Sequence, residues 1–217
     1  MTLTLHHVAQ ARSMRSLWLL HEIGVPFDLV VHQIGPDLRQ PEYLRLSGAG
    51  RVPCLVDGDV VLSESGAITE YLCATYAPEL GRRAGDSDWP DWLQWLHFSE
   101  TIGALVANLT LQHVMLFKPQ MRSPVLMKLE RKRLEVLLGV LDRHLEERDF
   151  VLDQFSGVDT NIGYGLYGAQ KFAPLASFPH AAAYFERMQA RPAFVKALPP
   201  EGAELIYKQD FYEVPNG

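Results

Sequence analysis

A tight-turn signature near residue 58 restricts the folds open to this chain. Two short apolar runs, Cys54–Val56 and Val60–Leu62, flank Asp57-Gly58-Asp59. An Asp-Gly pair tolerates the positive φ angles that a tight hairpin turn requires. The sequence therefore predicts an antiparallel pair of strands at this point.

The segments around this hairpin alternate between strand and helix patterns. Strand-like runs at Leu3–Val8 and Phe27–His32 enclose Ser13–Ile23, where apolar residues recur at helical spacing. A short helix is predicted over Pro41–Leu46 and another over Ala67–Tyr76. Two strands joined through a helix run parallel, and the hairpin adds antiparallel neighbours. We therefore expect an α/β domain with the order βαβαββα and a mixed sheet.

The remainder of the chain shows no strand pattern. We predict a first domain over residues 1–80, a polar, glycine-containing linker over residues 81–88, and an all-α helical bundle over residues 89–217. The helices of this bundle are predicted at Trp89–Phe117, Ser123–Arg148, Ser156–Phe172 and Pro179–Arg191. The chain is thus expected to form two domains of different classes.

Charge and composition narrow the classes of function. The chain has 217 residues, of which 47% are hydrophobic, and its formal net charge is −6 from 20 basic and 26 acidic residues. An acidic balance argues against nucleic acid or an anionic membrane as a partner. No apolar run approaches the roughly 18 residues of a membrane helix, and no signal-type segment opens the sequence.

Neither the cysteines nor the histidines form a metal or redox motif. Cys54 and Cys73 are the only cysteines, and their spacing matches neither a redox pair nor a metal knuckle. His6, His7 and His113 have no metal-ligand spacing either. We therefore expect two small buried thiols, no metal, and a reducing, cytoplasmic location.

Arg51-Val52-Pro53 immediately precedes the first strand of the hairpin. Proline cannot donate to a sheet ladder, so it belongs at a strand start or at a bulge. With a cis peptide bond, the backbone of Val52 would be free to pair with an extended, peptide-like ligand. An ordinary trans proline that opens a strand is the alternative interpretation.

Glu64-Ser65 lies at the start of the helix that follows the hairpin. The Ser65 hydroxyl and the free N–H groups of a helix N-terminus together suit a carboxylate, and Glu64 beside them can accept from an ammonium group. The pair therefore matches the head group of an α-amino acid. Helix capping alone is the simpler interpretation of Ser65.

The loop Gln10–Arg15 connects the first strand to the first helix. A helix N-terminus favours negative charge, and a hydroxyl placed there stabilises a thiolate. Ser13 supplies such a hydroxyl, and helix capping is its alternative role.

These features, in this order, resemble the glutathione transferase superfamily, and the resemblance covers essentially the whole chain. Leu17–Pro26 and Trp95–Glu100 look like a bacterial and fungal branch of it, and Ser156–Asp159 matches the capping box of its helical domain. The resemblance implies a thioredoxin-like first domain and an all-helical second one. It further implies a set of glutathione-binding residues: Arg51, Val52, Pro53 (as a cis proline), Glu64 and Ser65.

One position departs from the serine-type members that this chain resembles. Their catalytic serine falls on Ala11, four residues before Arg15. Ser13 and Arg12 are therefore the candidates for stabilising the glutathione thiolate, with backbone amides as a further candidate. Ser13 reaches the thiol only if the loop stays extended through it, because the first turn of a helix would rotate its side chain away. We expect the extended loop.

The resemblance implies a glutathione transferase with a role in detoxification, in which the thiolate attacks a small hydrophobic electrophile or a peroxide. Glutathione would be the co-substrate, and the protein would be a homodimer. Ala11 keeps two alternatives open, namely a non-catalytic glutathione- or ligand-binding protein and a glutathione-dependent disulfide reductase. Helix position suggests six residues for the wall of the electrophile site: Leu105, Asn108, Leu109, His113, Phe211 and Tyr212.

Overall fold

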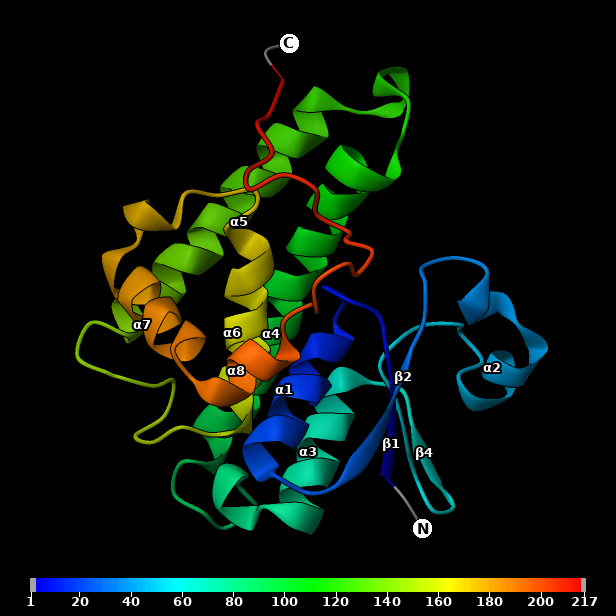
Figure 1. Cartoon of the computed structure of the whole chain (residues 1–217). Coiled ribbons are helices and arrows are strands. Elements are labelled where there is room, and N and C mark those ends of the chain that lie inside the picture. Colours follow the sequence, from blue (N-terminus) through cyan, green and yellow to red (C-terminus); the bar gives the residue numbers. More distant parts are fainter. Residues whose placement is uncertain (1–2, 216–217) are drawn as a thin grey trace. The chain divides into compact units, whose positions relative to one another are not determined.

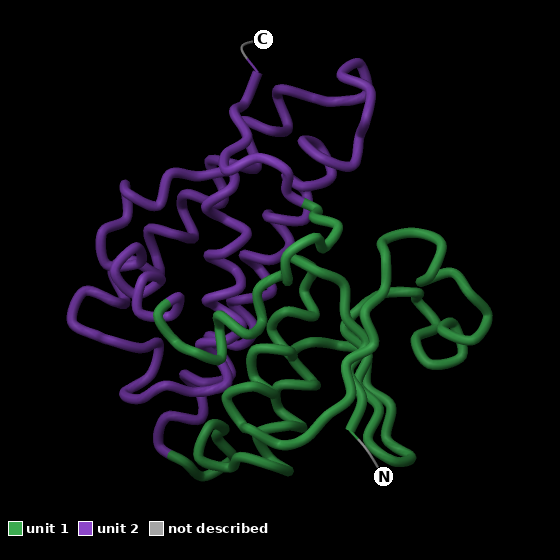
Figure 2. Tube along the Cα trace, viewed as in Figure 1, with its two compact units in different colours: residues 1–86, 190–206 green, residues 87–189, 207–217 purple. Residues whose placement is uncertain are grey.

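A computed structural model describes residues 3–215, and the chain divides into two compact units. Unit 1 comprises residues 1–86 and 190–206, and unit 2 comprises residues 87–189 and 207–217 (Figure 2). The first boundary falls inside the predicted linker. Residues 190–206 are predicted to belong to the helical domain, whereas in the structure they belong to unit 1.

Unit 1 is built on a four-stranded sheet in the order β2-β1-β3-β4. β1 (Leu3–His7) pairs parallel with β2 (Phe27–Val31) and antiparallel with β3 (Cys54–Asp57). β3 in turn pairs antiparallel with β4 (Val60–Leu62), and Gly58 at φ 59° makes the turn between them. The predicted hairpin and the mixed sheet are confirmed.

The helices of unit 1 cover both sides of this sheet. α1 (Ser13–Ile23) and α3 (Ser65–Tyr76) lie side by side on one face, and α2 (Pro41–Leu46) lies on the other side (Figure 1). The bounds of α1 and α2 coincide with the predicted ones. The order βαβαββα and the thioredoxin-like arrangement are therefore as expected.

A short helix absent from the predicted elements, α8 (Pro192–Ala197), packs on α1. The rings of Phe194 and Trp18 meet edge to face, with their centroids 4.9 Å apart. Arg191 donates to both carboxylate oxygens of Glu22, at 2.6 and 2.8 Å, and Trp18 Nε1 donates to the same carboxylate at 2.8 Å. An aromatic contact and a bidentate ion pair therefore tie residues 190–206 to unit 1.

Unit 2 is helical, and no strand is assigned in residues 87–189 or 207–215. Its main helices are α4 (Trp89–Thr110), α5 (Pro124–His144), α6 (Gly157–Ala169) and α7 (Pro179–Gln189). α6 is buried along its whole length and packs against α4. Throughout the described part of the chain, none of the helices combines the length and apolar character that a membrane crossing requires.

Candidate functional site

The sheet register brings the predicted motifs to one edge of unit 1. When the β1–β3 pairing is continued by one step, Pro53 lies opposite His7. When the β3–β4 pairing is continued past its last pair, Glu64 lies opposite Pro53. On the other side of β1, His7 pairs with Val31 at the end of β2. The edge row therefore reads Glu64, Pro53, His7 and Val31 across the four strands.

The peptide bond between Val52 and Pro53 is cis, as the resemblance implies. Pro53 is buried, Val52 is half-buried and Arg51 is exposed. The carbonyl oxygen of Arg51 accepts hydrogen bonds from the Tyr43 hydroxyl at 2.6 Å and from the Ser47 hydroxyl at 3.0 Å. Two side chains from α2 and its C-terminal end therefore fix the backbone directly ahead of the cis bond.

Ser65 is the first residue of α3, and Glu64 occupies the N-cap position before it. Glu64 is exposed, whereas Ser65 is only 4% exposed. Arg15 of α1 has no exposed surface, and its Nη1 donates to the Ser65 Oγ at 3.1 Å. A buried cation therefore lies next to the N-terminus of α3 and adds to the positive end of the helix dipole.

Arg15, which contacts the candidate site residue Ser65, is not among the residues predicted from the sequence. It lies among Met14, Leu17 and Trp18, which are all buried. Arginine is almost never fully buried unless a partner compensates its charge. A single cation within the apolar first turns of α1 is therefore the signal by which the sequence could have revealed it.

The backbone at and just before Ser13 is helical rather than extended, unlike the expected conformation. Arg12 already has helical angles (φ −54°, ψ −24°), and the helix begins at Ser13. Ser13 has no exposed surface, and its Oγ lies 2.9 Å from His7 Nδ1 and accepts from the Val8 N–H at 3.1 Å. The expectation of an extended loop is wrong, because the helix starts early enough to turn this hydroxyl toward the end of β1.

The groups that remain at the surface of this loop are Ala11 and Arg12, which are both partly exposed. Gln10 before them has φ 62°, a left-handed conformation that is uncommon for residues other than glycine and that clusters at functional loops. The Ala11 carbonyl accepts from the Met14 N–H at 2.9 Å, which closes the first turn of α1. Arg12 and the helix N-terminus are thus the features here that favour negative charge.

Both cysteines are free thiols buried in unit 1, as predicted. Cys54 is 0% and Cys73 is 1% exposed. Burial raises the pKa of the Cys54 thiol to about 11. Because the thiolate is the reactive form, this thiol is not prepared for nucleophilic or redox chemistry. Among residues 3–215, no group of three or more His, Cys, Asp or Glu side chains is arranged to hold a metal ion.

The six residues suggested for the electrophile-site wall all belong to unit 2. The rings of His113, Phe172 and Tyr212 form an aromatic cluster, with centroids 5.4 to 6.0 Å apart. Asn108 is exposed and Phe211 is half-buried. Core packing therefore explains the four that are buried: Leu105, Leu109, His113 and Tyr212.

Comparison with known proteins of similar sequence shows the family to which this chain belongs. A family model described as the N-terminal domain of glutathione S-transferase matches residues 11–75. Glutathione S-transferase 3 of Zea mays is 31% identical over 197 residues, which span 85% of this chain and 87% of the maize protein. The chain belongs to the glutathione transferase family. Glutathione S-transferase 3 of Schizosaccharomyces pombe is 28% identical to this transferase over 181 residues, with 78% of this chain and 75% of the yeast protein covered.

Solved structures agree with the fold of this transferase. The glutathione-S-transferase from Xylella fastidiosa is 30% identical to it, with a TM-score of 0.80 and coverage of 90% of this chain and 96% of that one. The theta class glutathione S-transferase from Xanthomonas axonopodis pv. citri, solved with glutathione bound, is 24% identical and has a TM-score of 0.81 over 91% of this chain and 97% of that one. At 24% identity, the similarity to the Xanthomonas axonopodis structure supports the fold of this chain and not its activity.

Proposed function

We propose that this transferase binds glutathione along the edge row of unit 1. The backbone of Val52 pairs with the cysteinyl unit, Glu64 and Ser65 hold the γ-glutamyl head, and Arg51 lies toward the glycyl carboxylate. The observation that carries the proposal is the register that aligns Pro53 with Glu64, together with the bond from Arg15 to Ser65. A carboxylate suits the N-terminus of α3, and an ammonium group suits the Glu64 carboxylate.

The bound thiol is activated by loss of its proton. A cysteine thiol has a reference pKa near 8.5, and lowering it by about two units takes roughly 2.7 kcal/mol of thiolate stabilisation. The N-terminus of α1 contributes about 0.3–1 kcal/mol, or up to about 2 kcal/mol where it is partly buried. Arg12 adds a positive charge, whereas the Ser13 hydroxyl is engaged with His7. We therefore propose that Arg12 and the helix N-terminus stabilise the thiolate, and that turnover of aryl halides is weak.

In the reaction, the thiol proton passes to solvent and the sulfur electron pair forms a bond to an electrophilic carbon. The bond from that carbon to the leaving group breaks, and its electron pair departs with the leaving group. The electrophile is a small hydrophobic molecule, and the two buried thiols are compatible with a reducing, cytoplasmic setting.

Glu64→Ala and Ser65→Ala are each expected to raise the dissociation constant of glutathione about ten- to hundredfold, because each removes a hydrogen bond to a charged group worth about 1.5–3 kcal/mol. Isothermal titration calorimetry measures the constant directly. Glu70→Ala, at an exposed position on the same helix, is the matched control and is expected to bind like the wild type.

Ser65→Ala also removes the acceptor for Arg15, so its thermal unfolding is measured in parallel. The exposed Glu64 provides the variant that leaves the core intact. Wild-type affinity in both variants would exclude this site. Turnover of aryl halide, epoxide, peroxide and mixed-disulfide substrates then distinguishes the reaction classes, and binding without any turnover would favour a non-catalytic glutathione-binding protein, the role that Ala11 suggests.

We further propose that the transferase is a homodimer. Along α5, the exposed residues Val125, Leu129, Val136 and Val140 lie on one face of the helix, at spacings of four, seven and four residues. Val125 and Val136 are 74% and 66% exposed. Although the exposed Lys132 and Arg133 interrupt it between Leu129 and Val136, an apolar stripe of this kind on a helix is typical of an interaction surface, and a second copy of this chain is the proposed occupant.

Val136→Glu is expected to shift the sedimentation mass from that of a dimer to near the 24.5 kDa of one chain, because it places a charge in the middle of the apolar stripe. Val195→Glu introduces the same charge at a 55% exposed valine on α8 and is expected to remain dimeric. A wild-type protein that sediments as a single chain would refute the homodimer.

A further inference from the structure

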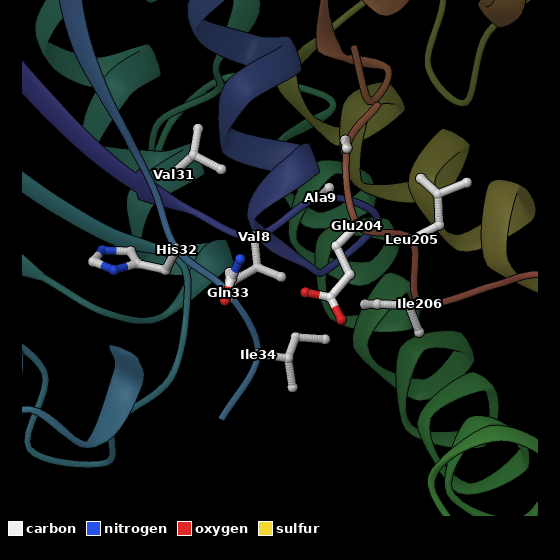
Figure 3. Close-up of a pocket in the computed structure, with 10 residues that line it drawn as sticks. Val8, Ala9, Val31, His32, Gln33, Ile34, Glu204, Leu205 and Ile206 are labelled. Carbon is white, nitrogen blue, oxygen red and sulfur yellow. The ribbon is translucent and has the colours of Figure 1, made fainter. Parts of the chain in front are cut away.

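Unit 1 contains a pocket of about 290 Å³ beside the loop that joins β1 to α1. The ends of β1 and β2 line it on one side, and residues 203–206 line it on the other (Figure 3). Its lining is apolar except for His32, Gln33 and Glu204. This volume is just below the roughly 300–1,000 Å³ of typical small-molecule sites, and polar groups share the lining surface with the apolar side chains.

The position of this pocket relative to the edge row suits a second substrate. Val8 and Ala9, which line the pocket, precede Ala11 and Arg12 by a single intervening residue, Gln10, and the thiolate is proposed to lie at Ala11 and Arg12. Val31 extends the row on the side of β1 opposite to Pro53. The pocket therefore adjoins the thiol from the β2 side, while the glutathione-binding groups lie on the β3 and β4 side.

The charge of the pocket is negative at neutral pH. Burial lowers the pKa of His32, against the raising effect of Asp37, which favours the neutral imidazole. Gln33 is uncharged, which leaves Glu204 as the charged member of the lining. Figure 3 shows the Glu204 carboxylate directed into the pocket, toward Gln33 and Ile34. Within the part of the chain that the structure describes, no basic side chain forms a salt bridge with it.

We propose that Glu204 gives this transferase a preference for electrophiles that combine an apolar body with a positively charged group. The apolar body occupies the wall made by residues such as Ile34 and Ile206, the cationic group lies against the Glu204 carboxylate, and the reactive carbon faces the thiolate. This inference rests on the proposed function. Glu204 is exposed at this pocket, so its carboxylate attracts a cation and disfavours an anion by the modest amount of a solvent-screened charge, and it thereby discriminates between electrophiles of equal shape.

Three benzyl bromides that differ only in the para group provide the test. The groups are trimethylammoniomethyl, its uncharged isostere 2,2-dimethylpropyl, and carboxymethyl, and each rate is corrected for the uncatalysed reaction with glutathione. The ratio of kcat/KM for the cationic to the isosteric bromide is expected to fall about fivefold in Glu204→Gln, as for a partly screened charge pair. Added salt is expected to reduce the same ratio in the wild type. Glu201→Gln, at an exposed position outside the pocket lining, is expected to keep the wild-type ratio.

An equal ratio in the wild type and Glu204→Gln, with turnover intact, would overturn the inference and leave the proposed function standing. Binding of unreactive analogues, with methyl in place of bromomethyl, separates the two proposals if no bromide is turned over. A cation preference in binding that Glu204→Gln removes would support the inference and count against thiolate attack. Equal binding of the cationic and isosteric analogues to the wild type would overturn the inference on its own.

Discussion

Replacing Asp159 by alanine is expected to lower the free energy of unfolding by about 3–5 kcal/mol, because several buried donors lose their acceptor at once. Asp159 has no exposed surface. Its carboxylate accepts from the backbone N–H groups of Val151 at 3.0 Å and Ser156 at 2.8 Å, and from the Tyr184 hydroxyl at 2.9 Å. One side chain therefore joins the start of α6 to the segment before it and to α7.

Urea denaturation followed by circular dichroism measures this loss. Asp153→Ala is the matched control, because the Asp153 side chain is 89% exposed and its contact with Arg148, at 3.4 Å, is a surface ion pair worth about 0–1 kcal/mol. We expect the control to unfold at nearly the wild-type midpoint. Similar midpoints for Asp159→Ala and the wild type would contradict the role of Asp159.

The same residue shows what sequence patterns can predict. Ser156 and Asp159 are three residues apart at the start of a helix, which is the spacing of a capping box, and the structure contains that box. The bond from Tyr184 joins residues 25 apart in the sequence, and no local spacing predicts it. Contacts within one turn are therefore predictable, whereas the contacts that make Asp159 important for stability depend on the packing of helices.

The features of the site in unit 1 also fall into two groups, those that local sequence patterns predict and those that depend on helix packing. The hairpin and the edge row follow from strand patterns and a turn, because strand register carries Pro53 and Glu64 to the same place once the hairpin closes. The bond from Arg15 to Ser65 spans 50 residues, and the ion pair from Arg191 to Glu22 spans 169. These pairs depend on how α1 packs against α3 and α8, which periodicity does not specify.

The sequence does not predict the direction of the Ser13 side chain, because that direction depends on the backbone conformation at the start of α1. A shift of one residue in the start of α1 rotates a side chain by about 100° around the helix. Sequence patterns do not specify whether the residues just before a helix are already helical or still extended. The bonds of the Ser13 hydroxyl to His7 and Val8 resolve this choice, because they hold it inside unit 1.

Ala11→Ser is expected to raise kcat/KM for conjugation about ten- to hundredfold, because a hydroxyl donor to a thiolate contributes about 1.5–3 kcal/mol. Ala11 is partly exposed and directly precedes the N-terminal turn of α1, so a hydroxyl there adds to the positive helix end. The thiol titration of bound glutathione, followed by the ultraviolet absorbance of the thiolate, is expected to move to lower pH in parallel.

Two comparisons separate the hydroxyl from other effects of this substitution. Threonine and valine have nearly the same shape, so Ala11→Thr is expected to lower the pKa of the bound thiol and Ala11→Val is not. Ser13→Ala is expected to titrate like the wild type, because the Ser13 hydroxyl is directed at His7 and Val8 and has no exposed surface. A shift of the thiol titration in Ser13→Ala would mean that this hydroxyl acts on the thiolate after all. An unchanged titration in Ala11→Ser would mean that Arg12 and the helix N-terminus already supply the stabilisation that a hydroxyl at position 11 is expected to add.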